Sequence, residues 1–185
     1  MIFQWTMLLV LSPLMLPPPP VGYPPDPGDL VITEIMADPA ATKDTSGEYL
    51  EVTNVSPHPL QLLGLIVRDN GKDWCPVTRP LVVPAGRAIV FARKWRPTSN
   101  GGFFPAYICT GHALHLKNDR DSLVLDWYGV DIDEVSYERR SWPMEPGKSM
   151  ELDRSCYDSR VNDEPSAWAP SRTPMASGDF GTPGQ

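Results

Sequence analysis

The chain has 185 residues, 41% of them hydrophobic and 21% charged, which is enough for one globular domain with a sizeable core. Its 22 prolines exclude an architecture of many long helices, because proline breaks helix interiors. The formal net charge of -7 argues against non-specific binding to phosphate backbones, which requires clustered lysine and arginine. One local basic cluster runs from Arg87 through Arg93 and Lys94 to Arg96, and we favour a solvated face as its interpretation.

The first 16 residues, MIFQWTMLLVLSPLML, are apolar and uncharged. A bilayer span needs about 20 such residues, whereas this length suits the apolar region of a secretory signal. The stretch lacks a basic start and a small-residue cleavage site. We expect residues 1–16 to be an export signal or lipid-facing anchor, with a misplaced start codon or a truncated longer protein as the alternative. Residues 17–28 are predicted as a stiff proline-rich linker, and residues 29–185 as one domain.

Short apolar runs, bounded by Gly, Pro, Asn and Asp, follow one another along this domain. Eight to ten short strands at such spacing are typical of an all-β sandwich or barrel. The dipeptide Asn70-Gly71 is the strongest hairpin signal, and no window supports a helix of three turns. In chain order the predicted strand regions are 29–36, 48–54, 60–69, 79–93 with a Pro-Ala-Gly turn inside it, 106–111, 112–118, 121–127, 130–137 and 148–154.

The stretch GEYLEVTN, residues 47–54, contains two glutamates three positions apart. In a helix Glu48 and Glu51 would share one face, as an acid/base pair requires. On a strand they point to opposite faces, roughly 10 Å apart along the chain. Because we predict a strand, we expect no paired carboxylate site. A buried carboxylate must be hydrogen-bonded, so we expect one of the two to bond backbone amides or an arginine in a structural role.

Several motifs occur in a characteristic order along the domain. They are DLVITEIMADP, GEYLEVTNVSPHPLQLLGLIVRD, VPAGRAIVFAR, LKNDRDSLVLDWYGVDIDEVSY, GKSMELDR, a tryptophan at position 168 and a final GTPGQ. In this order and spacing they resemble the lamin-tail domain over nearly all of residues 30–185. The resemblance implies an immunoglobulin-like β-sandwich of about nine strands, with no catalytic activity, no cofactor and no small-molecule substrate.

The departures from that family concern loops and context. Leu65-Ile66 replaces the usual Gly-Trp step, and NDRDS replaces the usual Asn-x-Gly-Asp turn. No heptad repeat precedes the domain, so the chain resembles the stand-alone or exported members of the family. Structural roles are predicted for the following motif residues: Glu34, Glu48, Tyr49, Glu51, Asn54, Gly64 and Trp168.

Three of these residues have roles that follow from their chemistry. Tyr49 is expected to pack into the core, and Gly64 lies where a hairpin needs unusual backbone angles. Asn54 ends its predicted strand and is expected to close an Asx-type turn before SPHP. We prefer this turn role to the formal glycosylation triplet NVS at the same position.

Residues 95–105, WRPTSNGGFFP, look like a loop insertion relative to the family pattern. We predict that Trp95, Phe103 and Phe104 are exposed there and contact a partner, because aromatic anchors are enriched at binding interfaces. The alternative, that the loop folds back over the sheet edge, is equally open.

No metal site is predicted. His112 and His115 fall on opposite faces of their predicted strand, and the acidic stretches NDRD and DIDE lack the pattern of an EF-hand loop. Cys75, Cys109 and Cys156 are far apart and form no zinc-ligand motif. One disulfide plus one free thiol would fit an exported protein, and the sequence leaves open which two cysteines pair.

These observations favour a non-catalytic module of an exported or surface-attached protein, secreted or in the cell envelope. It is expected to bind an unknown protein or surface polymer through loops at one end of the fold. The alternative is a C-terminal structural cap of a larger chain. The sequence contains no GxSxG, HExxH, P-loop or GxGxxG motif, so we predict no enzyme. We expect no nucleic-acid partner, and membrane contact only through residues 1–16.

Overall fold

The computed structural model describes residues 22–110 and 114–185. The predicted leader, residues 17–21 of the predicted linker, and His112 lie outside the described residues. The regular secondary structure of the described residues is mostly β-strand, and their two α-helices, α1 (Asp44–Gly47) and α2 (Pro97–Asn100), are single turns. No helix in the described ranges is long and apolar enough to cross a membrane. The prediction of an all-β fold is confirmed.

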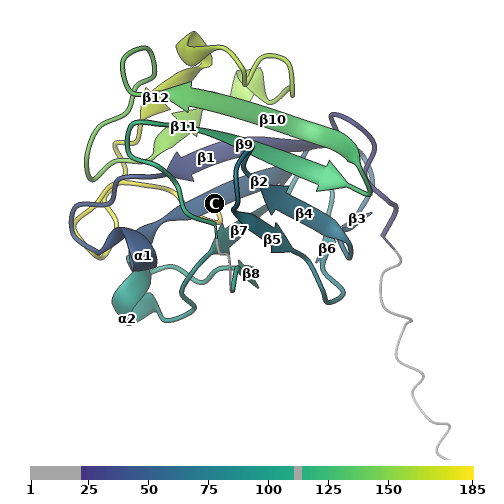
Figure 1. The fold of residues 1–185 in the computed structure, drawn as a ribbon, viewed down its shortest axis with the longest axis horizontal. Helices are drawn as coiled ribbons and strands as arrows, with labels where there is room; N and C mark the ends of the chain where they lie inside the picture. Colours follow the sequence, from purple (N-terminus) through teal and green to yellow (C-terminus); the bar gives the residue numbers. More distant parts are fainter. Residues whose placement is uncertain (1–21, 111–113) are drawn as a thin grey trace, which may run out of the picture.

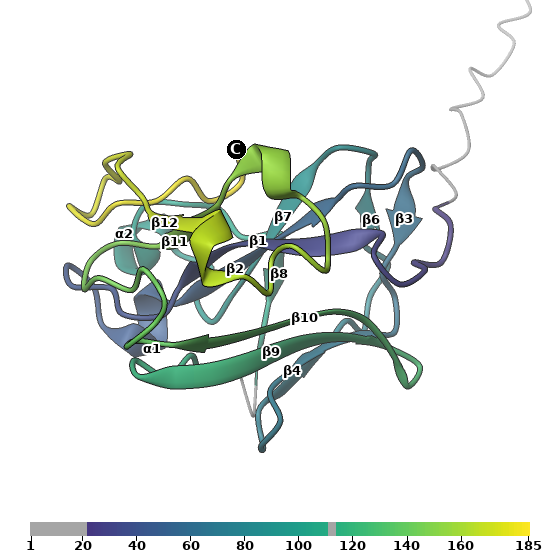
Figure 2. The same cartoon turned by 90° about the horizontal axis from the view of Figure 1, so that it is seen from above.

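Two sheets lie face to face as two layers (Figure 2). The larger sheet has the order β12-β11-β1-β2-β7-β8, and the smaller has the order β10-β9-β4-β5. In Figure 1 the smaller sheet lies in front of the larger one. All pairs are antiparallel except β7 with β8.

The strands of the larger sheet are β1 (Leu30–Met36), β2 (Tyr49–Asn54), β7 (Ala88–Ala92), β8 (Tyr107–Ile108), β11 (Met150–Leu152) and β12 (Trp168–Pro170). Those of the smaller sheet are β4 (Leu65–Arg68), β5 (Trp74–Pro76), β9 (Arg120–Trp127) and β10 (Val130–Glu138). A separate two-stranded sheet pairs β3 (Leu60–Gln61) with β6 (Val82–Val83). Two 3₁₀ turns, Arg154–Cys156 and Pro165–Ala167, precede β12.

The hydrophobic core lies between the two layers because side chains alternate along each strand. Leu50 and Val52 of β2 belong to the main core, together with Leu123 and Leu125 of β9. The alternate residues of β2 point to the outer face of the larger sheet. There Tyr49 belongs to a second, smaller apolar cluster. The segment after β12, residues 171–185, which we call the C-terminal segment, crosses this outer face, as the yellow chain in Figure 2 shows.

Two predicted strand regions differ from the structure, and the strands β5 and β12 lie outside all predicted regions. Residues 114–118 form no strand, since the backbone amide of Lys117 donates to the carboxylate of Asp121 instead of a neighbouring strand. The predicted region 60–69 is interrupted between β3 and β4 by Gly64, whose φ is +99°. A Cβ at this position would lie 2.7 Å from the hydroxyl oxygen of Tyr128, so glycine is needed there for both reasons.

The Asn70-Gly71 hairpin is confirmed, because β4 and β5 pair across residues 69–73. The turn is held by Asp69, whose Oδ1 accepts hydrogen bonds from the backbone amides of Gly71 and Asp73. The side chain organises the turn directly, as expected for Asx turns.

Asn54 is fully buried, and its predicted turn role is confirmed. Its Oδ1 accepts from the Ser56 amide at 2.9 Å, and its Nδ2 donates to the carbonyls of His58 and Val83. A glycan on this amide nitrogen would have to replace two hydrogen bonds in a buried site.

Part of the predicted linker is hydrogen-bonded to the domain. The amide of Tyr23 donates to the Pro59 carbonyl, and the Gln61 amide donates to the Tyr23 carbonyl. The amide of Gly28 donates to the carbonyl of Ile132 in β10. The backbone from Tyr23 onward therefore contacts the fold before the predicted domain start at Asp29.

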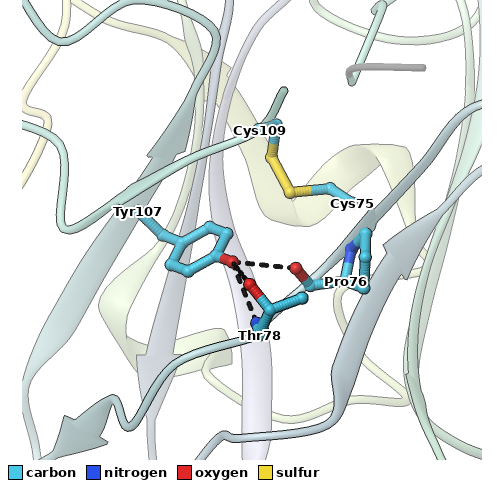
Figure 3. The surroundings of a disulfide bond; sticks show 5 residues. All are labelled: Cys75, Pro76, Thr78, Tyr107 and Cys109. Carbon is cyan, nitrogen blue, oxygen red and sulfur yellow. Dashed lines mark hydrogen bonds between the residues drawn. A yellow bond between two sulfur atoms is a disulfide. The ribbon is translucent and has the colours of Figure 1, made fainter. Parts of the chain in front are cut away.

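A disulfide joins Cys75 of β5 to Cys109, which directly follows β8 (Figure 3). The Cys109 amide donates to the carbonyl of Ala92, so this cysteine extends the larger sheet. The bond therefore links the two layers. Cys156 is the free thiol. Beside the disulfide, the Tyr107 hydroxyl donates to the carbonyl of Pro76, as Figure 3 shows.

Removing this cross-link should destabilise the fold markedly. Replacement of both Cys75 and Cys109 by serine is expected to lower the free energy of unfolding by about 4 kcal/mol, because the unfolded chain regains the entropy of an open loop. Urea denaturation followed by tryptophan fluorescence would measure the loss. Cys156→Ser, the matched control, should unfold near the wild-type midpoint. A double variant with an unchanged midpoint would contradict the assigned pairing.

Candidate binding surface

Residues 93–104 connect β7 to the segment before β8 and present two aromatic side chains to solvent; we call them the aromatic loop. Trp95 is 61% exposed and Phe104 is 72% exposed. Their rings contact each other edge to face, with centroids 6.1 Å apart. The predicted exposure of these two residues is confirmed.

Asn100 holds the aromatic loop in place from inside. Its side chain is fully buried, and its Nδ2 donates to the carbonyls of Lys94 at 2.9 Å and Phe103 at 3.0 Å. Its Oδ1 accepts from the amide of Gly102. One amide group therefore connects both ends of the loop, which fixes the separation of the two exposed rings.

The predicted exposure of Phe103 is wrong. This side chain is only 6% exposed, and its ring packs edge to face on Tyr49 at 4.9 Å. Gly101 and Gly102 have φ values of +104° and +99°, left-handed geometry that reverses the chain. As a result Phe103 folds back onto the outer face of the sheet, while Phe104 points outward. Phe104 is exposed, as predicted for a contact residue. Phe103 instead follows the alternative, in which the loop folds back over the sheet.

Positive charge surrounds Trp95. Arg93 pairs with the buried carboxylate of Glu48, with Nη1 and Oε2 3.2 Å apart. Lys94 and Arg96 are exposed and form no ion pair within the described part of the chain, and residues 1–21 and 111–113 contain no acidic residue. Arg87 does not join them, because it lies at the opposite end of β7. The predicted basic cluster is therefore reduced to three cations.

The aromatic pair lies between two surface hollows. One has a volume of about 460 Å³ and is lined by Trp95, the three cations, Ser46 and Ser99. The other has a volume of about 430 Å³ and is lined by Phe104 with parts of the C-terminal segment, including Pro174 and Pro183. The first hollow is cationic and carries hydroxyl groups, whereas the second has no charged side chain.

A row of carboxylates crosses the outer face of the larger sheet. The strand register places Glu51 of β2 opposite Glu34 of β1, and Glu34 opposite Glu151 of β11. Sequence reasoning missed this row, because it forms between strands that are distant in the chain. The predicted Glu48/Glu51 separation holds: Glu48 bonds Arg93, while Glu51 lies in the row. Both are buried, although only one was expected to be.

Backbone amides and side-chain hydroxyls of the same chain donate hydrogen bonds to these carboxyl groups. Glu34 accepts from the hydroxyls of Tyr49, Ser149 and Thr182 and from the Thr182 amide. Glu51 accepts from the hydroxyl of Thr33 and the amide of Gly184. The row thus fastens the C-terminal segment, which supports the structural roles predicted for Glu34, Tyr49 and Glu51.

Burial shifts the ionisation of these groups. It raises the pKa of Glu51 from its ordinary value of 4.5 to about 7, although the Gly184 amide opposes the shift. Burial likewise raises the pKa of Glu48 to about 8, against the favourable charge of Arg93. The pKa of Glu34 is also raised by burial, despite its hydrogen bonds from Ser149 and Tyr49.

Asp133 and Trp168 also make hydrogen bonds within the fold. Asp133, from the DIDE stretch, is buried and accepts from the Ile32 amide and from Nδ2 of Asn162. Trp168 lies in the core and donates from its indole nitrogen to the Asn162 carbonyl at 2.8 Å. In residues 22–110 and 114–185 no group of three or more His, Cys, Asp or Glu side chains is arranged to hold a metal ion.

Comparisons of the chain with protein-family models, with curated proteins and with solved structures give no match.

The raised pKa of Glu51 gives the stability a pH dependence. Its pKa is higher in the folded than in the unfolded chain, so the folded state binds more protons between pH 4.5 and about 7, and stability falls as pH rises through this range. Between pH 5 and pH 8 the Glu51→Gln variant should lose about 2–3 kcal/mol less of its free energy of unfolding than the wild type. Urea denaturation at both pH values would measure it.

The glutamine can keep both contacts of Glu51, with its oxygen toward the Gly184 amide and its nitrogen toward the Thr33 hydroxyl. Glu138→Gln, at an exposed glutamate, is the control and should leave the fall unchanged. Equal falls in the wild type and the Glu51→Gln variant would contradict the raised pKa.

Because Phe103 is buried and Phe104 is exposed, their truncation should affect stability to different extents. Phe103→Ala should lower the free energy of unfolding by about 3 kcal/mol, since a buried ring is lost against Tyr49. Phe104→Ala should change it by less than about 0.5 kcal/mol, because the ring faces solvent. Thermal denaturation of both variants would decide, and a larger loss from Phe104→Ala would contradict the assigned orientations.

Proposed function

We propose that this chain is a non-catalytic binding module of an exported or surface-attached protein, secreted or in the cell envelope. We further propose that its two layers have the immunoglobulin-like topology of lamin-tail domains. The motifs shared with that family and the two face-to-face sheets support this proposal. In this proposal the aromatic loop is the contact surface for a protein or surface polymer.

The observation that carries the proposal is the exposure of Trp95 and Phe104 on a fixed loop. Covering large aromatic rings with a partner removes apolar surface from water and lowers the free energy. Such residues contribute much of the binding energy at interfaces. Here Asn100 and the buried Phe103 order the loop before any partner arrives. Little conformational entropy is then lost on binding, which favours affinity.

Two further observations agree with the proposal. A disulfide between the layers suits a protein that matures in an oxidising compartment outside the cytoplasm. The buried glutamates accept hydrogen bonds from the C-terminal segment of their own chain, which agrees with a structural role. The alternative role as a C-terminal cap of a larger chain has no comparable observation in its favour.

Site-specific cross-linking in the native source would test this function. A photoreactive phenylalanine analogue at Phe104 should give covalent products of higher mass after irradiation. The matched control is Tyr128, which is 74% exposed in the β9–β10 turn and lies outside the aromatic loop. Products from position 104 alone would support the proposal. Equal yields from both positions, or none from position 104, would overturn it.

A further inference from the structure

We propose that the aromatic loop binds an anionic polysaccharide with widely spaced acidic groups, such as one carboxylate for every two sugar units. This inference rests on the proposed function and names the class of its partner. It goes beyond that function because it assigns separate roles to the cations, the rings and the two hollows. Three features of the surface carry it: ring geometry, the number of cations and the charge of the surroundings.

The aromatic pair offers apolar contact of limited area. Trp95 and Phe104 meet at an interplanar angle of 65°, so their rings form an angled ridge. The C–H face of a pyranose ring can pack against such a ring by dispersion contact. The core of an interface with a folded protein is depleted of lysine and acidic residues. Around Trp95 the neighbours are Lys94, Arg96 and Ser99, all exposed.

The hollow beside Trp95 supplies charge and hydrogen bonds. Lys94 and Arg96 are exposed and unpaired within the described ranges, and the hydroxyl-bearing Ser46 and Ser99 line the same hollow. Arginine binds a carboxylate through two parallel hydrogen bonds, and lysine adds a point charge. An acidic sugar with its hydroxyl groups matches this combination of side chains.

The hollow beside Phe104 has a different character. Its lining of glycine, alanine, proline, methionine, phenylalanine and Gln185 includes no charged side chain. A polymer crossing the ridge from one hollow to the other would therefore meet cations on one side only. An acidic sugar followed by a neutral sugar has this alternation, whereas a uniformly charged polymer does not.

The charge of the whole chain disfavours denser polyanions. A nucleic acid carries a phosphate on every nucleotide and needs a long basic track. The aromatic loop has three cations in a chain of net charge -7, so a densely charged strand would extend over repulsive surface. A polymer with sparse charges can pair with Lys94 and Arg96, the two cations left free within the described residues, and place neutral units elsewhere.

Direct binding measurements would test the inference. Calorimetry with a hyaluronate decasaccharide, which alternates a carboxylate sugar with a neutral sugar, should show binding that weakens with salt. Dextran of equal length is the neutral probe, oligo-dT is the nucleic-acid probe, and poly-glutamate is the acidic-polypeptide probe. We expect the protein to bind hyaluronate more tightly than each of these three.

Variants with matched controls separate charge from ring contact. Lys94→Gln with Arg96→Gln should weaken hyaluronate binding about tenfold, since two charge-assisted contacts are lost. Lys72→Gln with Arg87→Gln removes the same charge from exposed sites outside the loop and should leave binding unchanged. Trp95→Ala should also abolish most binding, while Trp74→Ala, at a 49% exposed tryptophan of β5, should not.

The outcomes distinguish the inference from the function on which it rests. Equal binding of dextran, tighter binding of oligo-dT or poly-glutamate, or no effect of the Lys94/Arg96 variant would overturn the polysaccharide assignment. If no probe binds but cross-linking at Phe104 still yields specific products, the assignment fails and the binding module stands. If cross-linking also fails, both are overturned.

Discussion

The buried carboxyl group of Glu34 organises the outer half of this structure. It lies on the face of the larger sheet that points away from the core, where a carboxyl without partners would be strongly destabilising. Its oxygens accept hydrogen bonds from Tyr49, Ser149 and Thr182, which belong to three different segments of the chain. Because Thr182 is close to the chain end, these bonds hold the C-terminal segment across the sheet.

The C-terminal segment in turn supports the aromatic loop. Gly102 lies so near Ala176 that an added Cβ would come within 2.8 Å of the alanine methyl group. Met175 packs on the apolar cluster that contains Phe103. Tyr49 completes the connection, since its hydroxyl bonds Glu34 while its ring packs on Phe103. The exposed rings thus sit at the outer end of a continuous set of contacts that begins at a buried carboxyl.

The two layers are joined by different chemistry at separate places. Asp133 of β10 accepts from the Ile32 amide of β1 at 2.7 Å, where the β1–β2 register shifts. The Cys75–Cys109 disulfide links β5 to the edge of the larger sheet. A polar bridge and a covalent bond thus supplement the apolar core between the sheets. Such fixed points suit a scaffold that keeps a short loop in one conformation.

Sequence alone determined the features that depend on local chemistry. Alternating apolar residues with closely spaced glycine and proline require short strands, and Asn54 and Asn70-Gly71 form their turns with neighbouring residues. Trp95 and Phe104 were identified as exposed from their loop. Tertiary structure decided what depends on residues distant in the chain: the pairing of Cys75 with Cys109, the row formed by Glu34, Glu51 and Glu151, and the inward orientation of Phe103. The orientation of Phe103 is set by the positive φ values of Gly101 and Gly102 and by its contact with Tyr49. Tyr49 is distant in the sequence, so this contact is not evident from the sequence alone. Local sequence patterns determine where strands and turns form. The partner of each buried group is determined only when strands that are distant in the chain come together in the sheets.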